Sequence, residues 1–192
     1  VHNQLYSIVL CFGDSILIRH NGDADLSGDP IPSTPAGIVY PFYVCSPSIS
    51  GPSLLDLLGD PCLLPGSASG MFVTQGIENR GSTWFYNDGT LQNAFNAGQP
   101  ISLFFAPATI DSYLDNSYEP SLVGGLPGPC VDVNLAEAFE VVYLNKISAT
   151  GINNQFTDDC IGKFTISGGY PQYDPTASYS VEVSLASNPS VK

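Results

Sequence analysis

Short runs in which apolar and polar residues alternate recur along this chain, and they constrain its fold more than any other feature. In residues 164–167, and again in residues 179–185, apolar side chains occupy every second position. A repeat of two residues is typical of a strand that buries one face. Gly168 and Gly169 separate the two runs, and glycine adopts the positive φ values that a tight reversal needs. The pattern predicts two strands joined by a glycine-rich elbow.

The same alternation, or a short apolar run, predicts further strands between turn signals. The expected strands cover residues 5–12, 15–20, 37–44, 70–74, 83–86, 101–106 and 139–144. The first two are expected to be consecutive strands or a hairpin around Gly13 and Asp14. Pro41 interrupts the third, and because proline has no N–H to donate to a ladder, it predicts a sheet edge or a bulge.

Two short helices are also expected. Residues 53–58 begin with Ser53 as N-cap, and Asp56 three residues later completes a capping box. Residues 91–97 form the second helix, and the segment Asn-Asp-Gly at residues 87–89 predicts a hairpin-type turn. Because strands are short and turn signals come about every 8–12 residues, the sequence predicts an all-β fold of Ig-like β-sandwich modules.

A glycine- and proline-rich run marks the expected domain boundary. Residues 124–129 are Gly-Gly-Leu-Pro-Gly-Pro, a sequence that holds no regular structure. We expect a larger, irregular β-rich domain over residues 1–125 and a smaller Ig-like sandwich over residues 130–192. The chain begins without Met and ends in a linker-like segment, which favours a piece of a longer exported protein.

The charge balance excludes two classes of partner. Five Lys and Arg stand against 18 Asp and Glu, which gives a formal net charge of −13. Binding to nucleic acid and electrostatic attachment to an anionic membrane both need a basic surface. The chain also lacks an apolar run of the roughly 18 residues that a membrane-spanning helix needs. We expect neither nucleic-acid binding nor membrane insertion.

The cysteine pattern favours disulfides, and therefore export, over a zinc site. Five cysteines are present without a C-x-x-C pair. Cys130 and Cys160 are expected to pair with each other. Among Cys11, Cys45 and Cys62 three pairings stay open, of which Cys45–Cys62 closes the shorter loop. The odd count leaves one thiol free or paired with another chain.

An acidic segment near the N-terminus is chemically suited to calcium. Asp23, Asp25 and Asp29 follow Asn21 at short intervals, and Ca²⁺ takes about six to eight oxygen ligands from a flexible, carboxylate-rich loop. The segment lacks the Gly and Glu of an EF-hand loop, and a solvated loop of Asx turns is the alternative. Calcium is the one cofactor that the sequence suggests.

A group of aromatic residues has two interpretations. Exposed rings provide a platform on which carbohydrate stacks, whereas buried rings fill the core or cover the edge of a sandwich. The sequence favours the second interpretation. The residues are Tyr40, Phe42, Tyr43, Trp84, Phe85 and Tyr86.

Residues 8–16, Ile-Val-Leu-Cys-Phe-Gly-Asp-Ser-Ile, resemble the first block of the GDSL esterases, in which Ser15 would be the nucleophile. Such a serine needs a general base within hydrogen-bond reach. The family supplies it from an Asp-x-x-His block near the C-terminus, and this chain has no histidine after His20. We therefore do not expect an enzyme.

The pattern Cys160-x-Gly162-x-Phe164-x-Ile166-x-Gly168-Gly169-x-Pro171-x-Tyr173 resembles the repeat modules of the gliding-motility surface adhesins of Bacteroidota (SprB-type). It differs in lacking the usual Trp after the Tyr. The resemblance implies Ig-like sandwiches strung into long fibres, exported by type IX secretion and used for adhesion or motility.

The function that we expect is therefore that of a structural and adhesive segment of a large, secreted cell-surface protein. Its partners would be other copies or neighbouring domains of the same long chain, and a cell surface or a glycan. The alternative is a calcium-stabilised β-sandwich module that binds carbohydrate or another ligand.

Overall fold

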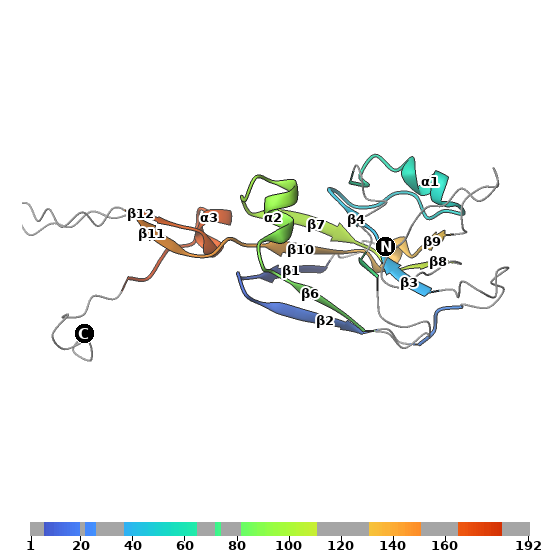
Figure 1. Ribbon diagram of the computed structural model, residues 1–192, viewed down its shortest axis with the longest axis horizontal. Coiled ribbons are helices and arrows are strands. Elements are labelled where there is room, and N and C mark those ends of the chain that lie inside the picture. Colours follow the sequence, from blue (N-terminus) through green and yellow to red (C-terminus); the bar gives the residue numbers. More distant parts are fainter. Residues whose placement is uncertain are drawn as a thin grey trace, which may run out of the picture.

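The computed structural model describes residues 6–19, 22–25, 37–64, 72–73, 82–110, 131–150 and 165–181. These residues form mostly short strands in several sheets, with a few short helices, so the all-β prediction is confirmed at this level (Figure 1). The strands are β1 (Tyr6–Leu10), β2 (Ser15–Arg19), β3 (Gly37–Tyr40), β4 (Phe42–Tyr43), β5 (Phe72–Val73), β6 (Ser82–Tyr86), β7 (Ile101–Phe105), β8 (Ala108–Ile110), β9 (Val131–Val133), β10 (Phe139–Tyr143), β11 (Ser148–Thr150) and β12 (Thr165–Ser167). The helices are α1 (Leu54–Leu58), α2 (Thr90–Phe95), the 3-10 helix Leu135–Glu137 and α3 (Gly169–Tyr173).

Two four-stranded sheets form the body of the molecule. The first sheet has the order β1-β10-β7-β4 and the second the order β5-β3-β8-β9. Three segments contribute to both sheets in turn: β3 continues into β4, β7 into β8, and β9 into β10. The two sheets are therefore consecutive parts of one interrupted antiparallel arrangement, to which β1 is added in parallel beside β10.

Proline explains the interruption between the two sheets. Val39 faces Ala108 and Phe42 faces Phe105, so the pairing keeps the same register on both sides of Pro41. Because proline cannot donate a ladder hydrogen bond, β3 ends before Pro41 and β4 begins after it. The predicted edge position is confirmed for β4, which ends the first sheet, but not for β3, which lies between β5 and β8 in the second sheet. Pro41 marks the passage from the second sheet to the first.

Period-two alternation builds a separate apolar cluster on each face of these strands. Ile38, Tyr40 and Phe42 belong to one cluster, whereas Val39 and Tyr43 belong to the other. The first cluster lies under the two-stranded β2–β6 ribbon, which contributes Phe85, and the second lies under α1 and the segment around Cys62. Because β3 contributes to both, all four of its residues are buried.

Two local predictions have different outcomes. The capping box is confirmed, because the Ser53 side chain accepts from the Asp56 N–H while the Asp56 side chain accepts from the Ser53 N–H. Of the two alternatives for residues 5–12 and 15–20, consecutive strands are found and a hairpin is not: β1 pairs in parallel with β10, and β2 pairs with β6. The turn at residues 87–89 does not join two strands either, because it leads from β6 into α2.

The strand pairing does not match the expected boundary at residues 125–130. β9 pairs with β8, and β10 lies between β1 and β7, so strands after the glycine-rich run complete the sheets formed before it. A terminal arm made of the β11–β12 ribbon and α3 lies beyond one end of the body (Figure 1). The expected strand at residues 179–185 is not formed as far as Val181, where the described part ends.

Gly168 and Gly169 do adopt the predicted positive φ values, 86° and 65°. They permit a close backbone approach rather than a strand reversal. A Cβ atom at Gly168 would overlap with the carbonyl oxygen of Lys146, and one at Gly169 would overlap with the Ile147 side chain. The glycine pair thus lets α3 pack against the start of the arm.

Candidate functional site

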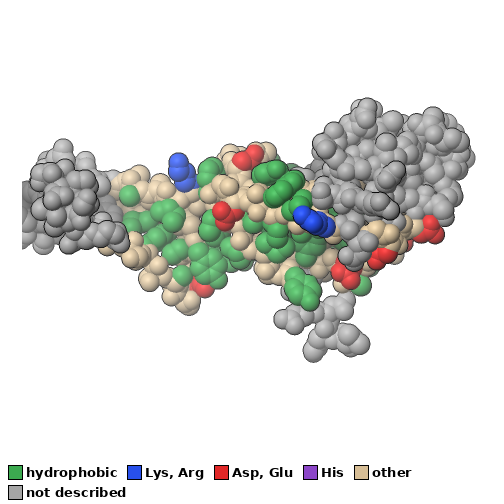
Figure 2. Space-filling model, turned by 90° about the horizontal axis from the view of Figure 1, so that it is seen from below, with side chains coloured by type: hydrophobic (Ala, Val, Ile, Leu, Met, Phe, Trp, Pro, Cys, Tyr) green, Lys and Arg blue, Asp and Glu red, His purple; other side chains and the backbone are tan. Residues whose placement is uncertain are grey.

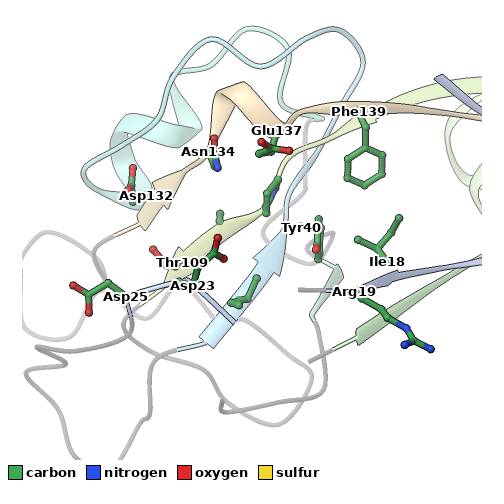
Figure 3. Close-up of a pocket in the computed structure, with 14 residues that line it drawn as sticks. Ile18, Arg19, Asp23, Asp25, Tyr40, Thr109, Asp132, Asn134, Glu137 and Phe139 are labelled. Atoms are coloured by element: carbon green, nitrogen blue, oxygen red, sulfur yellow. The ribbon is translucent and has the colours of Figure 1, made fainter. Parts of the chain in front are cut away.

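An open pocket of about 480 Å³ lies where the second sheet meets the end of the β2–β6 ribbon (Figure 3). It gathers residues from five separate parts of the chain. Its lining residues are Ile18, Arg19, Asp23, Ala24, Asp25, Ile38, Tyr40, Pro107, Ala108, Thr109, Asp132, Asn134, Glu137 and Phe139.

The inner wall of the pocket is apolar and rigid. Tyr40 and Phe139 are buried, with relative exposures of 2% and 9%, and their rings meet edge to face at 6.1 Å between centroids. Both rings belong to the core cluster that also contains Ile38. The wall is therefore an extension of the core, and its side chains hold their positions without a ligand.

The rim of the pocket is polar. Along β9, Val131 and Val133 face inward, so Asp132 and the following Asn134 face outward at the pocket. Asn134 Oδ1 accepts a hydrogen bond of 3.1 Å from the Ala136 N–H, which begins the 3-10 helix that presents Glu137. The exposed carboxylates and amide offer hydrogen-bond acceptors and donors to a ligand lying on the apolar wall.

The pocket has a strong negative bias. Among the described residues, its lining includes four carboxylates, at Asp23, Asp25, Asp132 and Glu137, and a single cationic residue, Arg19. The Arg19 side chain points away from the centre of the pocket (Figure 3). The site therefore disfavours anionic ligands and suits neutral, hydroxyl-rich or cationic ones.

Two of the three predicted calcium ligands, Asp23 and Asp25, line this pocket. Asp29 lies outside the described residues. Within the described segments, no three His, Cys, Asp or Glu side chains approach one another closely enough to hold a metal ion. Figure 3 shows Asp25 at the outer edge of the pocket, apart from Asp132 and Glu137.

The aromatic residues divide between the two interpretations. Four of them are buried in the core: Tyr40, Phe42, Tyr43 and Phe85. Trp84 and Tyr86, by contrast, are 47% and 58% exposed. Their rings lie 6.0 Å apart between centroids, with 27° between the ring planes. The alternation along β6 places this pair on the outer face of the β2–β6 ribbon.

The cysteine pairing closing the shorter loop is confirmed. Cys45 and Cys62 form a disulfide, with Cα atoms 5.1 Å apart, and Cys11 is free and exposed. Cys130 and Cys160 lie outside the described residues. The disulfide joins the ends of the loop that carries α1, on the opposite side of β3 from the pocket's wall residues.

Ser15, the nucleophile of the esterase resemblance, begins β2 opposite Tyr86. Its side chain is exposed on the ribbon, and it does not line the pocket. Both histidines of the chain, His2 and His20, lie outside the described residues.

Sequence reasoning missed most of the rim. No local pattern places the other rim residues beside Asp23, because the pairing of β8 with β9 brings them to the same pocket. These residues are Thr109, Asp132, Asn134 and Glu137. The alternation Val-Asp-Val-Asn at residues 131–134 was the available signal, since it predicts a strand that directs two polar side chains to one face.

Comparisons with protein-family models, with curated proteins and with solved structures gave no match to this chain. None of the helices in the described part of the chain has the length and apolar character needed to cross a bilayer. The class that the structure defines is thus a disulfide-containing all-β protein with an acidic, aromatic-walled pocket.

Proposed function

We propose that this chain is an adhesive module of an exported surface protein, and that it holds its ligand non-covalently in the acidic pocket. The observation that carries the proposal is the pocket itself, where a fixed wall around Tyr40 and Phe139 is surrounded by exposed polar groups. Such a combination retains a ligand by apolar contact and orients it by hydrogen bonds.

Other features support an extracellular, structural role. A disulfide persists in oxidising surroundings, which favours secretion. The β2–β6 ribbon packs over one face of the first sheet, and this layering supports an Ig-like sandwich relationship. The arm beyond the end of the body (Figure 1) suits end-to-end joining with neighbouring domains or copies in a fibre. Type IX secretion and a part in gliding motility belong to the same proposal, through the resemblance at residues 160–173.

Attachment under flow tests this proposal. Beads coated with the whole chain are passed over surfaces coated with neutral glycans, with proteins, or with nothing. We expect selective retention on a coated surface, and we expect the double variant Asp132→Asn/Glu137→Gln to lose it. The matched control, Asp88→Asn/Asp174→Asn, removes two carboxylates away from the pocket and should adhere like the wild type.

Two results would contradict the proposal. Beads carrying the wild-type chain that are retained on no coated surface would exclude adhesion. Full adhesion of the Asp132→Asn/Glu137→Gln variant would show that binding does not use the pocket.

A calcium-stabilised ligand-binding module is the second candidate, and it is favoured by the position of both Asp23 and Asp25 on the pocket. It predicts that a chelator lowers the melting temperature and that added Ca²⁺ restores it. The variant Asp23→Asn should show a smaller response than the wild type. A melting temperature that EDTA leaves unchanged would exclude stabilisation by calcium.

A further inference from the structure

The outer face of the β2–β6 ribbon is distinct from the remaining surface. The register pairs Ser15 with Tyr86 and Leu17 with Trp84, while Arg19 ends β2. Alternation directs these five side chains outward, because Thr83 and Phe85 on the same strand are buried. We refer to Ser15, Leu17, Arg19, Trp84 and Tyr86 together as the outer face.

The outer face has an unusual charge for this protein. The chain has a formal net charge of −13, yet Arg19 is the sole charged residue in the two strands of the ribbon. Figure 2, which views the molecule from the ribbon side, shows mainly hydrophobic and uncharged groups in the middle, with isolated acidic side chains among them and others toward the pocket end. The face is therefore suited to an uncharged partner.

The outer face also leads directly to the pocket. The two surfaces meet at Arg19, which lines the pocket, directs its side chain away from the pocket's centre, and lies on the same face of β2 as Leu17 and Ser15. The distance along a strand from the level of Tyr86 to the level of Arg19 is about 13 Å, or four residues. A ligand that occupies the pocket and continues over Trp84 and Tyr86 must be an extended chain.

From this continuity we infer that the adhesive ligand is a neutral polysaccharide, with one sugar in the pocket and the next sugars stacked on Trp84 and Tyr86. The inference rests on the proposed function, because it identifies the ligand of the same site. A sugar ring has a face of C–H groups and an edge of hydroxyl groups. The negatively polarised faces of the two aromatic rings attract the C–H groups. In the pocket, Asp132 and Asn134 are placed to hydrogen-bond the hydroxyls, and Arg19 at the end of the ribbon offers donors to the sugars that lie on the outer face.

Other extended ligands fit the surface less well. The carboxylates of the pocket repel an anionic polymer. A cationic peptide would find no acidic side chain between residues 15 and 19 or between residues 82 and 86 to pair with its charges. A lipid chain would leave the polar rim of the pocket without hydrogen-bond partners, which is unfavourable for buried polar groups.

The experiment uses chain length to separate the outer face from the pocket. Binding of β-1,4-linked glucose oligomers and β-1,4-linked N-acetylglucosamine oligomers, each of two and six sugars, is measured calorimetrically with the whole chain. We expect one series to bind, with the six-sugar oligomer binding more tightly than the two-sugar oligomer. Trp84→Ala and Tyr86→Ala should each weaken binding of the longer oligomer about tenfold and leave the shorter one unaffected.

Exposed positions were chosen so that the variants keep the fold. Tyr173→Ala, which removes a ring that is 43% exposed on the terminal arm, is the matched control and should bind like the wild type. Equal binding of the longer oligomer by Trp84→Ala, Tyr86→Ala and the wild type would overturn the stacking role while leaving adhesion through the pocket intact. Failure of both sugar series to bind, with adhesion to a protein-coated surface, would overturn the glycan assignment alone. Failure of adhesion on every coated surface would overturn the proposed function as well.

Discussion

At the scale of single residues, Asp60 organises the loop that carries the disulfide. Its side chain is 4% exposed and accepts hydrogen bonds from the N–H groups of Ser48 at 2.7 Å, Ile49 at 2.9 Å and Cys62 at 2.9 Å. Burial acts to raise the pKa of this carboxyl, but the backbone donors and the Ser48 hydroxyl together hold the pKa below its ordinary value. The charged carboxylate therefore stabilises the folded loop.

Asp60→Asn should reduce the free energy of unfolding at pH 7 by about 1–3 kcal/mol, because an amide N–H₂ replaces an oxygen that accepts from backbone donors. Since the folded pKa is lowered, the contribution of Asp60 is complete above the unfolded pKa of about 3.9 and is lost as the pH falls through the folded value. In urea unfolding, the free energies of wild type and variant should therefore begin to converge as the pH falls below about 4, and they should meet only below the folded pKa. A difference that stays constant with pH would contradict this account, and Asp132→Asn, at an exposed position, is the control.

Tyr43 is buried like Asp60, but within the described part of the chain its polar group lacks the hydrogen bonds that Asp60 has. Its ring is buried at 0% exposure, and its hydroxyl has no hydrogen-bond partner among the residues that the structure describes. Burial, together with the nearby negative charge of Asp60, raises the pKa of this hydroxyl, so it is neutral at every physiological pH. Tyr43→Phe should leave the free energy of unfolding unchanged or raise it, because no hydrogen bond is lost. A loss of more than about 1 kcal/mol in urea unfolding would reveal a missing partner, such as a buried water.

At the scale of elements, Asn87 holds together the ends of strands that do not follow one another in the chain. Its Nδ2 donates to the carbonyl oxygens of Leu10 and Leu144, each at 2.8 Å, and its Oδ1 accepts from Gln92 Nε2 at 2.6 Å. The side chain is 1% exposed. It thus connects the end of β6 with the ends of β1 and β10 and with α2.

Asn87→Asp keeps the size of this side chain but directs an acceptor at two carbonyl oxygens. We expect it to lower the free energy of unfolding at pH 7 by about 3–5 kcal/mol, as for a buried charge without a partner. The same replacement at the exposed Asn93, in α2, should have an effect of less than about 0.5 kcal/mol. Similar unfolding curves for the two variants would show that the hydrogen bonds of Asn87 contribute little.

The glycine pair before α3 allows the terminal arm to be tested separately from the body. Gly168→Ala introduces a Cβ at a φ of 86° that overlaps with the Lys146 carbonyl oxygen, whereas Gly13→Ala has a φ of 91° and nothing within 4 Å. Positive φ alone costs a non-glycine residue about 1–2 kcal/mol. Hydrogen exchange should therefore accelerate in the arm for Gly168→Ala, but not in β7 or β10. If Gly13→Ala loosened its own turn to the same degree, the overlap at Gly168 would be irrelevant.

The predictable parts of this fold are those whose causes lie within a few residues. Three such features were predicted from local chemistry: the Ser53–Asp56 capping box, the edge position of the strand after Pro41 and the positive φ of Gly168. The hairpin-type turn predicted at residues 87–89 was wrong. The Asn87 side chain donates hydrogen bonds to the carbonyl oxygens of Leu10 and Leu144, which are distant in the sequence. Local patterns do not show which strand pairs with which when strands are this short.

At the scale of the whole molecule, the parallel pairing of β1 with β10 determines what the folding unit is. The register from Tyr6 and Phe139 to Leu10 and Tyr143 joins the two ends of the body, across most of the chain. The pocket also depends on long-range pairing, since Asp23 and Glu137 line the same cavity only when β8, β9 and β2 are in place. No local sequence pattern reveals the β1–β10 pairing or the pocket. The boundary expected at residues 125–130 therefore separates strands that pair with one another in the same sheets.

Fragments distinguish the two descriptions of the chain. A fragment ending at residue 129 lacks β9 and β10, so β1 and β7 lose the strand between them and the cluster around Phe85 loses Phe139, Val141 and Tyr143. We expect it to show no cooperative unfolding transition, because that burial supplies much of the driving force for folding.

A fragment ending at residue 147 keeps both sheets and removes the terminal arm. It should unfold cooperatively in urea, with a smaller m-value than the whole chain because less surface is exposed. Binding of β-1,4-linked six-sugar oligomers by this fragment, if the whole chain binds them, would place the adhesive site entirely in the body. Cooperative unfolding of the fragment ending at residue 129 would instead show that β9 and β10 are dispensable, and would restore the boundary that the glycine- and proline-rich run suggests.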